Sequence, residues 1–267
     1  MTSPSSLDPS ARGPLGGAGI LVTRPAREAA GTAQRIAALG GEPFIFPAIV
    51  ILPPLDTKGL ERAHAALAKY DGAIFVSANA VEYGAPDSRR WPSTLTPFAP
   101  GPGTAQAVAD AGIPGTRIPS TSFDSEGLLA LPELADVRGK RFIVFRGDGG
   151  REQLGDTLRA RGADVDYIAC YRRAKPRGGT EGLADLFRER RIHAVTLTSS
   201  EGLDNLWEIV PEPLRAAWRA CPTFVPHERI AARARELGLP TVETGAGDAG
   251  LLAGLLQWFA DHPIPTA

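Results

Sequence analysis

Several residue types are scarce in this chain of 267 residues, and each scarcity excludes a class of protein. Its two cysteines, Cys170 and Cys221, are too few for a disulfide framework and match a reducing compartment, so we expect a cytoplasmic protein. Neither sign of charge is in excess, because 29 Lys and Arg face 30 Asp and Glu and leave a net charge of -1. No global positive field is available to bind nucleic acid or an anionic membrane, and we expect neither as a partner.

Long hydrophobic runs are also missing. The longest apolar stretches, residues 44–51 and 251–260, fall short of the roughly 18 residues that a membrane-spanning helix needs. The N-terminal segment has no apolar run typical of a secretory signal and is rich in Ser, Pro and Gly. We expect residues 1–16 to form a disordered leader.

Motifs for metals and cofactors are absent as well. The four histidines have neither metal-ligand spacing nor a partner pair of cysteines, and no glycine loop ends in the Lys-Ser/Thr of nucleotide phosphate loops. Residues 245–250 match the dinucleotide pattern G-x-G-x-x-G, but too little chain follows for the next strand and its ribose-binding acid. We interpret this segment as a flexible glycine loop and expect neither a metal nor a cofactor.

An internal repeat organises what is present. Two apolar runs that end in arginine, Ile20–Arg24 and Phe142–Arg146, lie 122 residues apart in the chain. The same spacing separates Ala73–Ser77 from Val195–Ser199, two β-like runs that end in a hydroxyl residue. The chain therefore contains two copies of one pattern.

Strands in each copy alternate with helical patterns, which indicates parallel sheets built from strand-helix-strand units. Gly40 and Gly162, at the same spacing, predict the ends of two equivalent helices. The helical segments 104–112 and 230–238 lie 126 residues apart, which indicates a four-residue insertion. We expect an α/β protein with two flavodoxin-like lobes, internally duplicated, whose ligands bind at the carboxyl ends of parallel strands.

Two segments between a strand and a helix, 77–79 and 198–201, are candidate anion sites. Free backbone N–H groups and the helix dipole favour a carboxylate or phosphate there. Simple capping is the alternative, since Thr198 and Glu201 have the spacing of a capping box. A third candidate is the tight Gly-Pro-Gly turn before Thr104, where the backbone is accessible and a hydroxyl is at hand.

Tyr171 ends a β-like run and is followed by two arginines. A phenol keeps its proton at neutral pH, so it can donate that proton or a hydrogen bond to a leaving hydroxyl. An ordinary tyrosine at a strand edge is the alternative interpretation.

Taken in order, six motifs resemble the uroporphyrinogen-III synthase family over about residues 18–260. They are Val22-Thr23-Arg24-Pro25, residues 75–81, residues 101–105, Arg146-Gly147, Tyr171-Arg172-Arg173 and Leu197-Thr198-Ser199. The family is known for closing the linear tetrapyrrole hydroxymethylbilane without a cofactor. The hydroxymethyl group leaves as water, and a spiro intermediate inverts the last ring. The resemblance implies a lyase of haem biosynthesis with hydroxymethylbilane as its substrate.

The resemblance also implies an architecture of two lobes joined by a two-stranded ladder. The ladder strands are expected at 46–52 and 168–173, with one continuous lobe at 53–167. The other lobe combines 17–45 with 174–267, and the ligand is expected between the lobes. We expect a monomer, and leave open a contact with hydroxymethylbilane synthase.

The repeat and the resemblance together predict the site. Tyr171 is the expected catalytic residue and assists departure of the hydroxyl. Substrate carboxylates are expected at the hydroxyl, backbone or guanidinium groups of Arg24, Ser77, Thr104, Arg146, Ser199 and Ser200. The assignment of the two arginines comes from their matching places in the repeat, and ordinary surface arginines are the alternative.

Two departures from the family pattern leave a second function open. Val76 stands where the family's F-T-S motif has Thr, and His227 and Ile230 occupy the Gly and Thr places of a second G-x-x-T-A. We expect backbone N–H groups, helped by Arg229, to keep an anion contact there. The alternative is a non-catalytic, tetrapyrrole-sensing regulatory protein of the same fold; a nucleotide or sugar receptor would need a fingerprint that we do not find.

Overall fold

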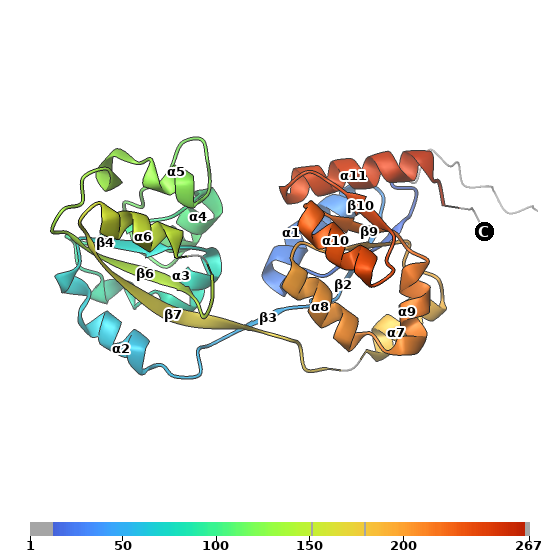
Figure 1. Ribbon diagram of the computed structural model, residues 1–267, viewed down its shortest axis with the longest axis horizontal. Helices are drawn as coiled ribbons and strands as arrows, with labels where there is room; N and C mark the ends of the chain where they lie inside the picture. The colour runs from blue at the N-terminus through green and yellow to red at the C-terminus, as the bar shows by residue number, and fades with distance from the viewer. Residues whose placement is uncertain (1–12, 151, 179, 265–267) are drawn as a thin grey trace, which may run out of the picture. The chain divides into compact units, whose positions relative to one another are not determined.

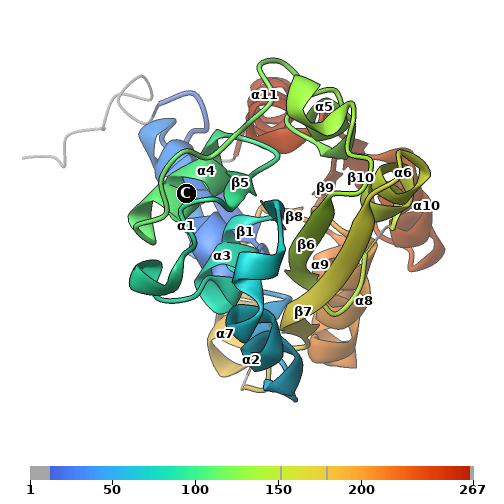
Figure 2. The same ribbon diagram turned by 90° about the vertical axis from the view of Figure 1, so that its left-hand side faces the viewer.

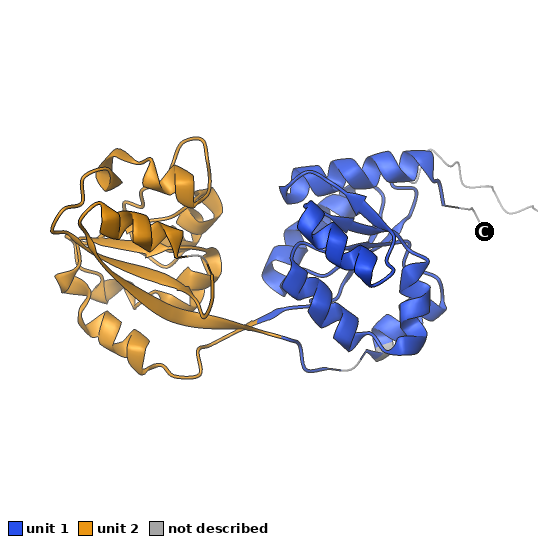
Figure 3. Cartoon of the chain, in the orientation of Figure 1, with its two compact units in different colours: residues 1–50, 175–267 blue, residues 51–174 orange. Residues whose placement is uncertain are grey.

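The computed structural model describes residues 13–150, 152–178 and 180–264, and Figure 1 shows their helices and strands. They fall into two units (Figure 3), of which unit 1 contains Met1–Val50 with Lys175–Ala267 and unit 2 contains Ile51–Ala174. The chain therefore passes from one unit to the other twice.

The expected leader overlaps the ordered chain. Its residues 1–12 lie outside the described residues, whereas residues 13–16 form a turn. Leu15 in this turn is 1% exposed and packs in one apolar cluster with Ile20 and Ile36. The structure differs from the expectation at these four residues because Leu15 completes part of the core.

Unit 1 contains one parallel sheet with helices on both faces. Its strands are β1 (Gly19–Val22), β2 (Glu42–Ile45), β8 (Ala194–Thr196), β9 (Thr223–Val225) and β10 (Thr241–Glu243), in the order β10-β9-β8-β1-β2. Its helices are α1 (Ala26–Ala38), α7 (Glu181–Arg188), α8 (Ser200–Ile209), α9 (Glu212–Arg219), α10 (Glu228–Glu236) and α11 (Gly247–Asp261). Helices α1 and α11 cover one face, and α7 to α10 cover the other (Figure 1). All of β1 is buried, as a central parallel strand between two helix layers must be.

Unit 2 repeats this layering. Its strands are β3 (Val50–Leu52, whose first residue is counted in unit 1), β4 (Gly72–Phe75), β5 (Thr96–Phe98), β6 (Arg141–Gly147) and β7 (Asp164–Ala174). Its sheet has the order β3-β7-β6-β4-β5. Its helices are α2 (Lys58–Ala65), α3 (Ala78–Gly84), α4 (Pro102–Asp110), α5 (Ser125–Leu129) and α6 (Gln153–Ala160). The β5-β4-β6-β7 pairings are parallel. Helices α2, α3 and α4 pack on one face of this sheet and α5 and α6 on the other (Figure 2).

Strand registers in the two units match at the spacing of the sequence repeat. In unit 1, Ile20 of β1 pairs with Ala194 of β8. In unit 2, Phe142 of β6 pairs with Gly72 of β4, and each residue lies 122 positions from its counterpart. The predicted α/β class with parallel sheets is confirmed.

Pro47 interrupts the segment 46–52, in which the first strand of the ladder was expected. Residues 46–49 lie in no strand, and β3 begins only at Val50. Pro47 has no N–H to donate, so the chain cannot continue a sheet there. Ala48 is instead buried, and its carbonyl accepts a hydrogen bond of 3.1 Å from the Asn205 side chain.

Both predicted helix ends are confirmed. Gly40 and Gly162 follow α1 and α6 with φ of 81° and 92°, the left-handed conformation that glycine adopts without steric cost. The longest helix in the described part of the chain is α11 with 15 residues, and no helix there combines the length and the apolar character needed to cross a membrane.

Candidate active site

Ser77 lies in the short connection between β4 and α3 and is the N-cap of α3. Its Oγ accepts a hydrogen bond of 3.1 Å from the backbone N–H of Ala80. Capping uses a lone pair of the oxygen, so the hydroxyl hydrogen stays available to a carboxylate or to a second hydroxyl. The same Oγ lies 3.4 Å from the phenolic oxygen of Tyr171. The structure thus brings two of the predicted site residues together.

Gly147 makes room for the Tyr171 ring. Tyr171 lies on β7, and a register shift between Arg146 and Gly147 places Gly147 opposite it at the end of β6. A Cβ atom at Gly147 would lie 2.8 Å from that ring, closer than real contacts allow. Only glycine therefore fits beside the buried tyrosine, which is 3% exposed.

Cys170, adjacent to Tyr171, is a small side chain in the core of unit 2. It is fully buried, and its thiol donates a hydrogen bond of 3.2 Å to the carbonyl of Arg146. Burial raises the pKa of the thiol to about 12, so Cys170 is no nucleophile at neutral pH.

Arg146 lies at the end of β6, and its guanidinium has an unused hydrogen-bond donor. Its guanidinium lies 4.6 Å from the ring centroid of Tyr167, and Nη2 donates to the carbonyl of Gly150 at 3.2 Å. Its Nη1 is buried and makes no hydrogen bond to any described residue. An unsatisfied cationic donor of this kind is suited to an anionic ligand.

Thr104 and its counterpart in unit 1 differ in burial. Thr104 is half-buried in the first turn of α4, whose N-cap Gly101 has no side chain to cap it. In unit 1, Ile230 is 1% exposed and packs in the apolar core, and the N-cap of α10, His227, makes no side-chain capping bond. The α10 terminus therefore offers backbone N–H groups, beside the exposed Arg229.

Ser199, rather than Thr198, caps α8 in unit 1. Its Oγ accepts a hydrogen bond of 3.0 Å from the backbone N–H of Gly202, so the capping box considered for Thr198 and Glu201 is not the observed arrangement. The helix begins one residue later, because Ser199 still has extended backbone angles. Ser200 follows as the first helical residue and is half-buried.

Arg24 already has a carboxylate partner within unit 1. Its guanidinium forms an ion pair with Asp248, and each of the two side chains is 17% exposed. Asp248 also accepts hydrogen bonds from Arg35 at 2.7 Å and from the Thr32 hydroxyl at 3.3 Å. The interpretation of 245–250 as a flexible loop is wrong from Gly247 onward, where α11 begins, and Asp248 was therefore not predicted. Its place in the first turn of α11, where an acidic side chain meets the positive end of the helix dipole, was the available signal.

The predicted residues are divided between the units, always near the carboxyl ends of strands. Ser77, Thr104, Arg146 and Tyr171 belong to unit 2, and Arg24, Ser199 and Ser200 belong to unit 1. Within the described residues, no three His, Cys, Asp or Glu side chains gather as metal ligands would. Fold and site define an α/β protein with helices on both faces of each sheet, whose strand ends carry hydroxyl, guanidinium and helix N-terminal groups of the kind that suit an anionic ligand.

Comparisons with known proteins narrow this class. A family model described as Uroporphyrinogen-III synthase HemD matches residues 30–252. Uroporphyrinogen-III synthase of Salmonella typhimurium is 38% identical over 225 residues, which cover 82% of this chain and 91% of that protein. The chain belongs to the uroporphyrinogen-III synthase family.

Solved structures agree in fold. The crystal structure of uroporphyrinogen-III synthetase from Helicobacter pylori 26695 matches with a TM-score of 0.58 at 12% identity, covering 92% of this chain and 99% of that chain. A mutant uroporphyrinogen III synthase from the bacterium Thermus thermophilus matches with a TM-score of 0.53 at 19% identity, covering 91% and 99%. The family resemblance found in the sequence is confirmed, and the regulatory alternative has no support in these comparisons.

Proposed function

We propose that this chain acts as a uroporphyrinogen-III synthase, a cyclising lyase that converts hydroxymethylbilane to the ring-inverted isomer. The observation that carries the proposal is the family match, which spans residues 30–252 and both units. The site adds chemistry that suits a polycarboxylate substrate at the strand ends of each unit.

Tyr171 is the proposed catalytic residue. The bond between the hydroxymethyl carbon and its oxygen breaks, and the hydroxyl takes up a proton and leaves as water. The Tyr171 phenol supplies the hydrogen bond or proton for this departure, and its contact of 3.4 Å with Ser77 Oγ orients the phenol. The resulting azafulvene then closes through a spiro intermediate.

Orientation is the second part of the proposed mechanism. Unassisted closure gives the unturned isomer, so the enzyme must hold a flexible chain in which the wrong carbon cannot react first. The hydroxyl groups of Ser77, Thr104, Ser199 and Ser200 and the guanidinium of Arg146 are the proposed carboxylate contacts. Arg24 joins them through a guanidinium that already binds the carboxylate of Asp248.

The finer architecture is part of the proposal. The units are proposed to be duplicated flavodoxin-like lobes, 17–45 with 174–267 and 53–167, linked by strands within 46–52 and 168–173. The matching registers of β1 with β8 and of β6 with β4 support this duplication. A cytoplasmic monomer remains our expectation, and both cysteine thiols are free, as a reducing compartment allows.

The role of Tyr171 is tested by Tyr171→Phe, with Tyr83→Phe as the matched control. The Tyr83 ring lies 6.4 Å from the Tyr171 ring, but its hydroxyl bonds to the carbonyl of Ile51. We expect the consumption of freshly generated hydroxymethylbilane to slow by about a hundredfold in Tyr171→Phe and by less than about twofold in the control. Full turnover by Tyr171→Phe would remove Tyr171 from the mechanism.

A further inference from the structure

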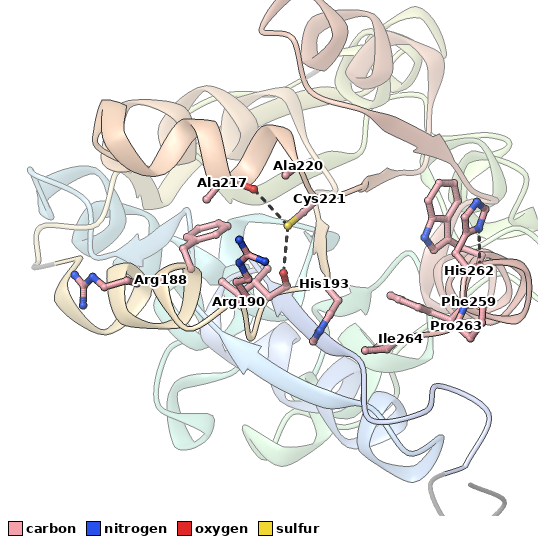
Figure 4. Close-up of a pocket in the computed structure, with 13 residues that line it drawn as sticks. Arg188, Arg190, His193, Ala217, Ala220, Cys221, Phe259, His262, Pro263 and Ile264 are labelled. Atoms are coloured by element: carbon pink, nitrogen blue, oxygen red, sulfur yellow. Dashed lines mark hydrogen bonds between the residues drawn. The ribbon is translucent and has the colours of Figure 1, made fainter. Parts of the chain in front are cut away.

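Unit 1 contains a cavity of about 660 Å³ that the proposed reaction does not use (Figure 4). His193 and Cys221 line it, and these residues precede β8 and β9, so the cavity lies at the amino ends of the strands. Ser199 follows β8 at the carboxyl end. The cavity and the candidate active site of unit 1 are therefore at opposite edges of the sheet.

Aromatic side chains form the apolar part of the cavity. Phe187 of α7 and Phe259 of α11 line it and are 5% and 7% exposed. Trp258 and His262 line it as a stacked pair with ring centroids 3.9 Å apart. A volume of several hundred Å³ with aromatic walls is typical of sites for small organic molecules.

Charge at the cavity has one sign. None of the described residues that line the cavity is acidic, whereas two of them, Arg188 and Arg190, are basic. Arg188 forms an ion pair with Asp185, and in Figure 4 its guanidinium points away from the other lining residues. Arg190 is exposed and makes no ion pair or side-chain hydrogen bond with the described residues, and its guanidinium lies among the lining residues in Figure 4.

Two acidic residues near Arg190 pair with a different arginine. Arg191, the residue after Arg190, forms ion pairs with Glu42 and Glu189. Burial raises the pKa of the Cys221 thiol to about 11 and lowers the pKa of His193, so both groups are neutral at neutral pH. Among the described residues that line the cavity, Arg190 is therefore the cation that is free to bind an anion.

The backbone of Arg190 is itself unusual. Its φ is 55°, and among the described residues Arg190 is the one non-glycine residue with a positive φ. It closes α7 with an N–H donated to the carbonyl of Phe187 at 3.1 Å, a place that glycine or asparagine commonly takes.

We propose that this cavity binds an amphipathic organic anion, an aromatic ring system that carries one carboxylate or sulfonate. The rings lie among Phe187, Trp258 and Phe259, and the anionic group meets the Arg190 guanidinium. This site is carried by the geometry of unit 1 alone and does not depend on the proposed synthase activity.

The test uses two probes that differ in charge, 8-anilinonaphthalene-1-sulfonate and its uncharged relative N-phenyl-1-naphthylamine, titrated into the full chain and followed by fluorescence. Arg190→Asn removes the cation but tolerates the left-handed backbone. Arg188→Gln is the matched control, and Ala217→Trp fills the cavity. We expect one sulfonate probe per chain, bound at least tenfold more weakly by Arg190→Asn, equally by Arg188→Gln and not by Ala217→Trp.

The uncharged probe should bind wild type and Arg190→Asn within about twofold, because it loses no ion pair. In unaltered protein the sulfonate probe should also slow modification of the Cys221 thiol by a maleimide, a readout that needs no variant. Equal binding of the sulfonate by wild type, Arg190→Asn and Ala217→Trp, or no protection of Cys221, would overturn the proposal. Binding that disappears as protein concentration rises would instead assign the cavity to contact with a second copy of the chain.

Discussion

The hydroxyl groups of Ser77 and Ser199 can each accept one hydrogen bond and donate another. Each side-chain oxygen accepts a backbone N–H in the first turn of a helix, Ala80 in one case and Gly202 in the other. Each keeps one hydrogen that can be donated outward to a carboxylate. Stability and substrate binding therefore depend on different features of the same side chain, and substitutions can separate them.

Substitutions at Ser199 provide that separation. Ser199→Ala removes the cap and should lower the free energy of unfolding by about 1 kcal/mol. Ser199→Asp restores an N-cap acceptor but places a negative charge where the substrate carboxylate is proposed to bind, so its stability should match wild type while KM rises at least about tenfold. Denaturant unfolding and steady-state kinetics measure the two effects. If Ser199→Asp turned over substrate normally, the proposed carboxylate contact would be wrong.

Gly147, at the end of β6, leaves the space that the Tyr171 side chain on β7 occupies. Because a Cβ atom there would lie 2.8 Å from the Tyr171 ring, Gly147→Ala should displace the phenol from Ser77. We expect turnover to fall by about tenfold to a hundredfold and unfolding to become about 1–3 kcal/mol easier. Gly149→Ala is the control, since a Cβ atom at Gly149 would meet nothing within 4 Å. Equal kinetics for the two variants would contradict this role.

The junction of β1 with β8 has its own pH dependence. His193 precedes β8, and its Nδ1 accepts a hydrogen bond of 2.9 Å from the N–H of Gly19, which begins β1. Burial lowers the pKa of His193, against the opposing effects of a backbone hydrogen bond at Arg191 and of Glu42. The folded chain therefore takes up this proton less readily than the unfolded chain, whose pKa is near 6.5.

This contribution to stability is present above pH of about 6.5 and is lost as the pH falls toward the lowered pKa of the folded state. His193→Asn keeps an acceptor near the Nδ1 position but does not titrate. The difference in unfolding free energy between wild type and His193→Asn should therefore shrink between pH 7.5 and pH 5.5. Tryptophan fluorescence is a suitable signal, because three of the four tryptophans lie in unit 1. A difference that stays constant with pH would exclude this effect.

In the molecule as a whole, local sequence patterns predicted more than long-range pairs. The runs that became β1, β4, β6 and β8 were readable because β propensity and flanking turn residues are local properties. Their repeat at one spacing also indicated which strands are equivalent. By contrast, the Arg24–Asp248 ion pair joins residues far apart in the chain, so no local pattern predicts it.

Three smaller differences have similarly specific causes. The N-cap of α8 is Ser199, one residue after Thr198, where a capping box was considered. Propensity alone does not say which of two adjacent hydroxyl residues caps a helix. Pro47 shortens the expected ladder strand to β3. The register shift that brings Gly147 opposite Tyr171 depends on the pairing of two complete strands.

The isomer formed from hydroxymethylbilane is the most direct test of the central claim. Purified protein is incubated with freshly generated hydroxymethylbilane, the products are oxidised, and the isomer I and isomer III porphyrins are separated by chromatography. We predict that isomer III dominates and that the substrate is consumed faster than in buffer. Isomer I alone, formed at the rate of the buffer control, would contradict the synthase activity while leaving the α/β fold and the family assignment in place.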